Sequence, residues 1–373
     1  MKIARARPGE RLRIRNRELP FSFFPVGSGA RRKGVFDPLF ASSPWAVMSG
    51  RITDRLGGAE RDEALAFLDQ AQRFYAAAGA EDLANPLLYY YSFLNLAKPL
   101  IRALGFGGSL EVAVHGLSNK RIGEGSSPKD FEVKVQHLHG EQVNVFVELS
   151  DKLGFGRPAP GTSYNIEELM VEMVVGHRLW REATQGRERF VPIADVEILQ
   201  DATASEMWIR LLVEREDVDR FGIGHTQTLR EGRLIDDFRL VKEEGVPAEC
   251  FGMEQLSAIN YGHRPSDKLP DLVAPLREPL WRIVTSDPER SYRKYYLHLT
   301  PPEVPRLPQL LALWALLFHY GSMVRYQPHV FAAMTRERHG AFIREFVAAQ
   351  PEQMLYLFAS EMCEREVAKP AIA

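Results

Sequence analysis

The stretch LPQLLALWALLFHYGSMVRYQPH, residues 307–329, decides the fold of this chain. From Leu310 to about Met323 it is apolar on nearly every side, and a helix without a polar face is one that other elements surround. The run is also too short to cross a bilayer, which needs about 20 apolar residues. It therefore predicts a buried helix at the centre of a helical domain.

More helices are predicted near both ends of the chain. Apolar residues recur every three or four positions over 60–79, and an Asn-Pro pair opens another helix over 85–104, in which Pro99 predicts a kink. Two amphipathic helices, over 337–349 and 351–367, close the chain. We expect the two sets to pack together, so that one helical domain is assembled from both ends of the sequence.

The middle of the chain has the patterns of β-strands. Residues 131–136 alternate between apolar and polar, and 143–149 mirror them across a turn, which predicts a hairpin. Several more strands are expected between 190 and 299. The predicted fold class is α+β, a helical domain built from both chain ends with a β-rich central section.

These patterns suggest three parts of the chain. Residues 1–59 read as a basic N-terminal arm followed by an irregular linker rich in Gly, Pro and Ser. The helical domain is expected to contain residues 60–120 together with 305–367, and the β-rich section residues 121–304.

The composition is that of an ordinary globular protein: 373 residues, 45% hydrophobic and 26% charged, with a formal net charge of −2. It excludes a disordered chain, a collagen-like repeat and a disulfide-dense secreted scaffold. The near-zero net charge also excludes a global field that steers the whole molecule to nucleic acid. The N-terminus has neither the apolar core nor the cleavage site of a signal peptide, so we expect a cytoplasmic protein without membrane contact.

The charge is nevertheless uneven. Residues 1–33 hold ten basic and two acidic residues, a net charge of +8. Within them, every second residue over 11–17 is an arginine, which predicts one strand with its arginines on one face: Arg11, Arg13, Arg15 and Arg17. Such a face can bind along the phosphate backbone of a nucleic acid. It is more typical of a solvated edge strand whose charges prevent pairing between edges, and we favour that interpretation.

Several stretches resemble one known family. PLLYYYSFLNLAKPLI (86–101), HGL (115–117) and FEVKVQ (131–136) look like the N-terminal half of the YaaC-like bacterial proteins, and GSMVRYQPH (321–329) looks like the Arg-Tyr-x-Pro turn near that family's end. The matches occur in the same order at both ends of the chain. The family has no established biochemical activity, so the resemblance implies architecture and candidate positions but no reaction, and the basic arm is additional to it.

Strong catalytic signatures are absent. The sequence lacks a phosphate-binding Walker loop, a dinucleotide fingerprint, a zinc-protease motif, paired C-x-x-C and a nucleophile elbow. A nucleoside triphosphatase, a dinucleotide-dependent enzyme or a standard hydrolase is thus not expected, and no cofactor is predicted. Whether the protein is an enzyme stays open.

The best composite site lies where the two helical ends would meet. Asn95 and Lys98 lie three residues apart on one predicted helix, and His115 follows at a strand end. Arg325 and His329 flank Pro328 and Tyr326, a further candidate binding residue, where the apolar helix terminates. The simplest interpretation is that these polar groups tie helix ends together, because buried polar groups are normally satisfied.

The functional interpretation is a helical ribonuclease of the HEPN kind. There an Arg would stabilise the scissile phosphate and a His would assist proton transfer, with Arg325, His115 and His329 as tentative catalytic residues. Pro328 intervenes between Arg325 and His329, whereas such enzymes place the pair within one regular helix.

A second enzymatic alternative uses the predicted hairpin. Glu132 and Lys134 project to the same face of a strand, with Glu111 on a preceding strand, and this layout imitates Mg²⁺-dependent nucleases. Charged residues on the polar face of an alternating strand are common without any such role, so no metal is assigned and Glu111 with Glu132 remain a weak alternative.

Two functional hypotheses follow. The first, which we favour, is a non-catalytic component of a bacterial cytosolic system, whose basic arm binds nucleic acid or a protein partner. The second is a nuclease, either of the HEPN kind or metal-dependent. Homo-oligomers are compatible with either.

Overall fold

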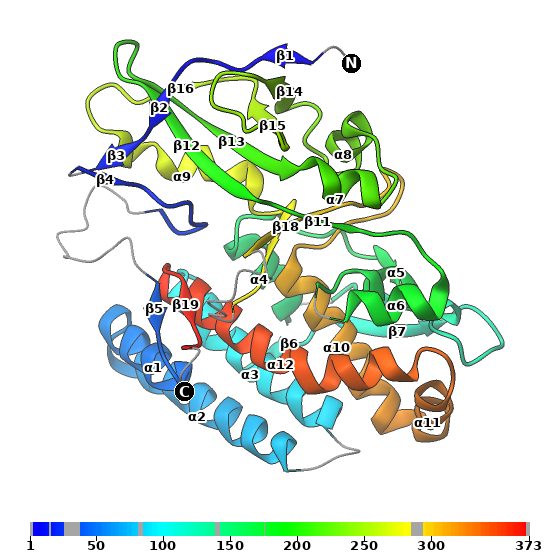
Figure 1. The fold of residues 1–373 in the computed structure, drawn as a ribbon. Coiled ribbons are helices and arrows are strands. Elements are labelled where there is room, and N and C mark those ends of the chain that lie inside the picture. Colours follow the sequence, from blue (N-terminus) through cyan, green and yellow to red (C-terminus); the bar gives the residue numbers. More distant parts are fainter. Residues whose placement is uncertain are drawn as a thin grey trace. The chain divides into compact units, whose positions relative to one another are not determined.

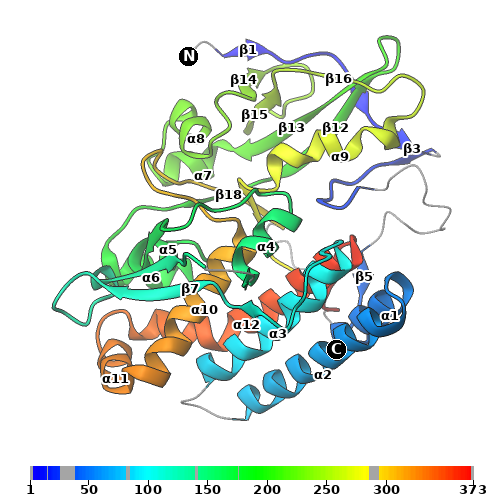
Figure 2. The same ribbon diagram turned by 180° about the vertical axis from the view of Figure 1, so that it is seen from behind.

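The structure is a computed structural model of residues 1–373 (Figures 1 and 2). It describes residues 3–14, 16–25, 38–80, 85–138, 142–174, 176–284 and 294–370. The chain divides into two compact units: unit 1 contains residues 1–39 and 187–306, and unit 2 contains residues 40–186 and 307–373. Helices and several small sheets occur together, so the predicted α+β class is confirmed.

Unit 2 is mainly helical. Its longer helices are α1 (Pro44–Arg55), α2 (Gly58–Gly79), α3 (Asn85–Ala103), α10 (Gln309–Tyr326), α11 (Pro328–Arg336) and α12 (Gly340–Cys363), and its shorter ones are α4 (Val145–Lys152), α5 (Ile166–Val171) and α6 (His177–Thr184). Helix α10 is buried from Leu310 to Gly321 and packs against α3, α5 and α12. No described helix is both long and apolar enough to cross a membrane.

The predicted helices over 60–79, 85–104 and 310–323 are confirmed as α2, α3 and α10. The last two predicted helices are wrong in their bounds, because α12 continues through Pro351 as one helix and α11 forms before it. Pro99 likewise lies inside α3 without ending it. A proline inside a helix lacks its own N–H donor and its ring crowds the carbonyl group four residues earlier, and the tertiary packing of these buried helices outweighs that cost.

The predicted hairpin over 131–136 and 143–149 is wrong. Strand β8 (Phe131–Val135) forms, but it pairs antiparallel with β7 (Leu117–Arg121) and with β10 (Ser163–Asn165). The second segment gives only β9 (Val143–Asn144), paired with β6 (Ala113–Val114), before it enters α4. The Asn144 side chain accepts a hydrogen bond from the Val147 amide at 3.0 Å, and this N-terminal cap outweighs the β-propensity of the following residues.

Unit 1 is built on a seven-stranded sheet. Its strands run in the order β1 (Ala4–Arg5), β14 (Phe238–Lys242), β15 (Cys250–Gln255), β13 (Glu206–Glu214), β12 (Asp195–Asp201) and β2 (Glu10–Arg11), and β16 (Ile259–Asn260) also pairs with β13. Alternate residues such as Ile209, Leu211 and Met253 form the buried core on one face. That core also contains residues of α7 (Arg215–Arg220), α8 (His225–Glu231) and α9 (Leu269–Val273).

A second, three-stranded sheet completes unit 1. It joins β11 (Phe190–Pro192), β18 (Tyr295–His298) and β17 (Leu280–Arg282), with β18 in the middle. Short 3₁₀ turns lie at Pro265–Asp267 and Ala274–Leu276, and a third, Pro128–Asp130, precedes β8 in unit 2. Two further short strands are β5 (Leu39–Phe40) and β19 (Val367–Ala368).

Residues 4–11 cross the other face of the seven-stranded sheet from edge to edge (Figures 1 and 2). Strand β1 pairs parallel with β14 at one edge, and β2 pairs antiparallel with β12 at the other. Midway, a Cβ added at Gly9 would lie 2.6 Å from the ring of Trp208 and 3.1 Å from the Gln200 carbonyl oxygen, so only glycine fits. We call residues 4–11 the N-terminal strap.

The single strand predicted over residues 11–17 is wrong. The chain instead forms β3 (Arg13–Ile14) and β4 (Arg17–Glu18), which pair antiparallel as a hairpin. Asn16 adopts a left-handed conformation, with φ of 64°, between the two strands. Asparagine tolerates this conformation better than most residues, which allows the reversal that strand periodicity did not indicate.

The limits of the units differ from the three parts suggested by the sequence. Residues 1–39 belong to unit 1 and 40–59 to unit 2. Of the expected β-rich section, 121–186 lie in unit 2 and 187–304 in unit 1. The reason is that β7 and β8 pack against α10 and do not join the seven-stranded sheet.

Candidate functional site

Helices α3 and α10 of unit 2 approach each other closely at Gly321. A Cβ added there would lie 3.2 Å from the Pro86 carbonyl oxygen and 3.2 Å from the Tyr90 Cβ. A larger side chain would therefore force the helices apart or distort them. The glycine lets the last turn of α10, which begins just beyond it, lie against the first half of α3.

Arg325 occupies that last turn and is held by two tyrosines. Its Nη1 donates to the Tyr91 hydroxyl at 2.6 Å, and its Cζ lies 4.9 Å from the centroid of the Tyr326 ring. The Tyr91 ring lies 5.7 Å from Phe74 of α2, and the exposed fraction of Tyr326 is 67%. Arg325 is exposed, and among the described residues no carboxylate forms an ion pair with it.

His329 lies on the next helix. Gln327, whose φ is −138°, separates α10 from α11, and His329 is exposed in the first turn of α11. The structure therefore places Arg325 and His329 on two helices and not on the single regular helix of the HEPN pattern. We call Tyr91, Arg325, Tyr326 and His329 the Arg325 surface.

A buried aromatic layer lies next to this surface. The Tyr90 ring centroid is 5.4 Å from that of Tyr91, 5.4 Å from that of Phe318 and 6.2 Å from that of His115. Burial raises the pKa of Tyr90, and the positive charge of Arg325 opposes this rise only in part. Within the described part of the chain, the buried Tyr90 hydroxyl has no hydrogen-bond partner.

His115 is a neutral ring in this layer. Its Nδ1 accepts a hydrogen bond from the Leu117 amide at 3.1 Å, and burial lowers its pKa because the charged form is poorly solvated. With Nδ1 engaged as an acceptor, the neutral ring carries its proton on Nε2. His115 is therefore placed as a hydrogen-bond donor, and its only basic nitrogen is already occupied.

The two polar candidates on α3 have structural partners. Asn95 is 7% exposed, and its Nδ2 donates to the Tyr91 carbonyl oxygen one turn earlier at 3.0 Å. The Lys98 ammonium lies 4.4 Å from the centroid of the Phe67 ring of α2, and burial lowers its pKa. Asn95 thus supports the helix carrying Tyr91, whereas Lys98 lies between α2 and α3.

The carboxylates of the metal-dependent alternative lie on different kinds of element. Glu111 is exposed in a turn that precedes β6, and Glu132 is half-buried on β8, which belongs to another sheet. The expected placement of Glu111 on a strand is wrong, because strand structure begins only at Ala113. In the described residues, no group of three or more His, Cys, Asp or Glu side chains is arranged to hold a metal ion.

In unit 1, the N-terminal arginines are largely engaged with carboxylates. Arg11 Nη2 lies 2.5 Å from Asp195 and 2.9 Å from Glu197, and the hydrogen bond that Arg11 donates to Asp195 raises the pKa of Arg11. Arg13 pairs with Glu18 at 3.3 Å on the hairpin. Arg17 is exposed, and Arg15 lies outside the described residues.

The strap also covers a row of alternating charges. Glu197, Arg210, Glu254 and Arg239 lie opposite one another across β12, β13, β15 and β14. The fully buried Glu254 carboxylate accepts from Arg210 at 3.1 Å and from Arg239 at 2.9 Å, and the Nε of Arg7 lies 3.6 Å from it. This network connects the strap to four strands of the sheet.

Sequence reasoning missed Tyr91, Tyr90 and this charge row. The three tyrosines at 89–91 fall within the predicted helix over 85–104, and only the tertiary structure separates buried Tyr90 from half-exposed Tyr91. The one available signal was that neighbouring helix positions differ by about 100° around the helix axis, so they cannot all face the core.

The fold and the site define an α+β protein whose helical unit presents an exposed arginine between two tyrosines. Residues 40–362 match the YaaC-like Protein family, and the chain belongs to this family. The matched range begins at the first residue of unit 2 and includes the Arg325 surface, whereas the strap lies before it. No curated protein and no solved structure matches the chain.

Proposed function

We propose that the protein is a non-catalytic nucleic-acid-binding component of a bacterial cytosolic system and that it binds through the Arg325 surface. The observation that carries this proposal is the state of Arg325. It is exposed, it is oriented by the Tyr91 hydroxyl and the Tyr326 ring, and among the described residues it lacks a carboxylate partner.

These groups suit a phosphate next to a base. A guanidinium offers a planar set of donors that fits phosphate oxygens, and one already oriented by Tyr91 loses less freedom on binding. The largely exposed Tyr326 ring offers a face on which a base can stack, which contributes about 1–3 kcal/mol per base in single-stranded complexes. His329 lies one turn further along the chain and adds a hydrogen-bonding group.

The N-terminal arginines support nucleic-acid binding less well. Arg11 and Arg13 pair with carboxylates, and the strap residue Arg7 lies against the carboxylate of Glu254. A phosphate that displaced these carboxylates would leave the acidic residues without their cations. Among the described arginines of the predicted arm, Arg17 can bind a phosphate without displacing a carboxylate.

The nuclease alternative keeps one supporting observation. His115 and Arg325 both lie near Tyr90, so two of the tentative catalytic residues have a common neighbour. Against it, the basic nitrogen of His115 is engaged and His329 is on a separate helix. Cleavage is therefore an outcome to be read in the same assay as binding.

The test measures binding of labelled single-stranded RNA and DNA oligonucleotides by fluorescence anisotropy over a salt series, followed by a gel that detects cleavage. We expect Arg325→Ala to weaken binding at least about tenfold and to reduce the salt slope by about one, whereas Arg325→Lys keeps part of the affinity. Arg178→Ala, an exposed arginine on α6, is the matched control.

Arg17→Ala separates the two candidate surfaces. Loss of binding in Arg17→Ala, with Arg325→Ala unaffected, would transfer the proposal to the N-terminal hairpin. Cleavage that disappears in Arg325→Ala would favour the nuclease. If wild type neither binds nor cleaves, the nucleic-acid proposal is rejected, and a protein ligand becomes the next candidate.

A further inference from the structure

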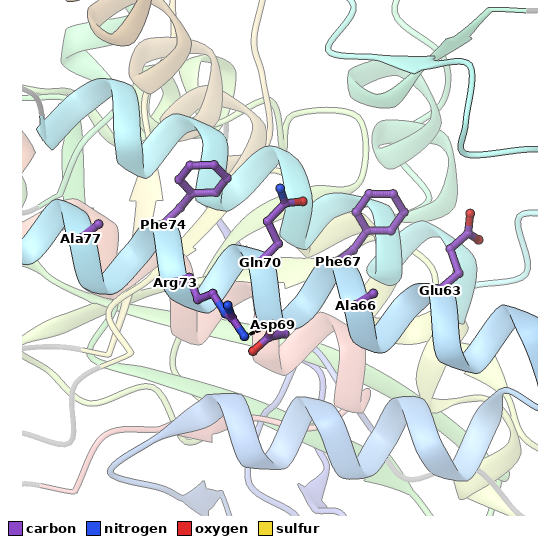
Figure 3. Close-up of a pocket in the computed structure, with 8 residues that line it drawn as sticks. All are labelled: Glu63, Ala66, Phe67, Asp69, Gln70, Arg73, Phe74 and Ala77. Atoms are coloured by element: carbon purple, nitrogen blue, oxygen red, sulfur yellow. Dashed lines mark ion pairs between the residues drawn. The ribbon is translucent and has the colours of Figure 1, made fainter.

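The outer flank of α2 carries an uncovered stripe with a hollow of about 660 Å³. The hollow is lined by Glu63, Ala66, Phe67, Asp69, Gln70, Arg73, Phe74 and Ala77 (Figure 3). Phe67 and Phe74 remain half-exposed there, two turns apart, with Gln70 between them. Each ring touches α3 on one side, Phe67 at the Lys98 ammonium and Phe74 at the Tyr91 ring, and the part of each ring that remains exposed could be covered by another element.

Three pairs of stripe residues lie nearly symmetrically about residue 71. The midpoint of the pair Asp69 and Arg73 in the sequence is residue 71. The midpoint of Phe67 and Phe74 lies just before residue 71, and that of Ala66 and Ala77 lies just after it. Two antiparallel helices related by a two-fold axis bring positions at equal distances on either side of that axis opposite each other. An axis next to residue 71 would thus bring Phe67 opposite Phe74 of the other helix, and Asp69 opposite Arg73.

We propose that α2 packs antiparallel against α2 of a second copy of this chain, about a two-fold axis next to residue 71. Asp69 and Arg73 of one copy already pair at 2.9 Å, and their side chains are 60% and 79% exposed. In the dimer these two residues and their equivalents in the second copy form a cluster of four alternating charges. The phenylalanines of the two copies fill the hollows on either side of it.

The charges of the stripe favour a second copy of the chain over nucleic acid as its binding partner. Glu63 and Asp69 outnumber Arg73 within the stripe, and Arg73, the cation that lines it, is already paired with Asp69, so the stripe offers a phosphate no unpaired cation. A second copy instead supplies opposite charges at matching positions, which gives register and orientation to the contact. The proposed dimer does not depend on the proposed nucleic-acid function.

The dimer would nevertheless position the Arg325 surfaces. Phe74 lies against Tyr91, so each stripe ends beside one Arg325 surface. Antiparallel pairing would place the two surfaces at opposite ends of the interface.

The experiment measures the dissociation constant of the full-length dimer by sedimentation equilibrium over a micromolar range. The variants are Asp69→Arg and Arg73→Asp, first separately and then mixed in equal amounts. Each single variant places like charges opposite each other across the axis and should raise the dissociation constant about tenfold. In the mixture, one copy has two positive and the other two negative residues, so heterodimers should form at least as tightly as the wild type.

Circular dichroism of each variant checks that α2 stays folded. A wild type that sediments as a monomer over the whole range would overturn the proposal. So would single variants that dimerise like the wild type, or a mixture that associates no better than its components. Since these measurements contain no oligonucleotide, failure of the dimer and failure of nucleic-acid binding are distinguishable.

Discussion

The Arg325 guanidinium and the Tyr91 hydroxyl lie 2.6 Å apart, and this hydrogen bond joins the end of α10 to α3. The two residues are 234 positions apart in the sequence. Their contact orients an exposed cation beside an exposed ring, and it depends on the close helix approach at Gly321.

Tyr91→Phe should weaken oligonucleotide binding while leaving the fold intact. The substitution removes only the acceptor for Arg325, and a hydrogen bond of this kind contributes about 1 kcal/mol, which corresponds to roughly a fivefold loss of affinity. Anisotropy titrations and thermal unfolding would measure the two effects. An unchanged affinity, in a protein that Arg325→Ala still disables, would show that the hydroxyl does not orient the arginine for binding.

Gly321→Val should destabilise unit 2 by about 1–3 kcal/mol, because the added atoms overlap with Pro86 and Tyr90 across the helix contact. Urea unfolding measures the change. The matched control is Ser322→Val, which introduces the same β-branched residue at the next, half-buried position of α10. Since valine has a better helix propensity than glycine, a loss in Gly321→Val no larger than that in Ser322→Val would contradict the close approach as its cause.

Glu254→Gln should cost about 3–5 kcal/mol of unfolding free energy, since it leaves three arginine side chains in unit 1 without their shared carboxylate. Glu249→Gln, at an exposed position, should change the unfolding free energy by less than about 0.5 kcal/mol. Chemical denaturation of both variants in parallel provides the measurement. A loss for Glu254→Gln as small as that of the control would contradict a structural role for the charge network.

His319 should make the protein less stable as the pH falls. Burial lowers its pKa from 6.5 to about 3 in the folded state, while its Nδ1 lies 3.1 Å from the Asn119 Oδ1. Between these two pKa values the unfolded state binds more protons than the folded state, so stability decreases with decreasing pH by up to about 1.4 kcal/mol per pH unit.

His319→Asn provides the comparison for this prediction. It removes the titrating ring but keeps a donor for Asn119, so its unfolding free energy should fall less steeply with pH between about 6 and 4. Urea denaturation at several pH values measures both slopes. Parallel slopes for wild type and variant would exclude His319 as a source of the pH dependence.

The helical framework could be read from local sequence. Helices α2, α3 and α10 have the periodicity or the continuous apolar content that a packed helix needs. The ends of each helix lie within three residues of the predicted ends. Local sequence misled at 143–149, where Val and Phe favoured a strand. There the Asn144 cap and the burial of α4 determined a helix.

The site could be predicted only in part. The sequence indicated Arg325 and Tyr326 from the turn that ends an apolar helix, and both belong to the Arg325 surface. It did not indicate Tyr91, because three adjacent tyrosines differ only in the direction that α3 gives each ring. That direction depends on where α10 packs.

What the sequence by itself determined is therefore the class of fold, the main helices and the excess of positive charge near the N-terminus. Only the tertiary structure decided how that charge is used. Arg7 and Arg11 lie against carboxylates nearly 200 or more positions away, Glu254 and Glu197. Helix periodicity arises from bonds between near neighbours, so it is visible in a short window, whereas ion pairs form between residues that only the folded sheet brings together.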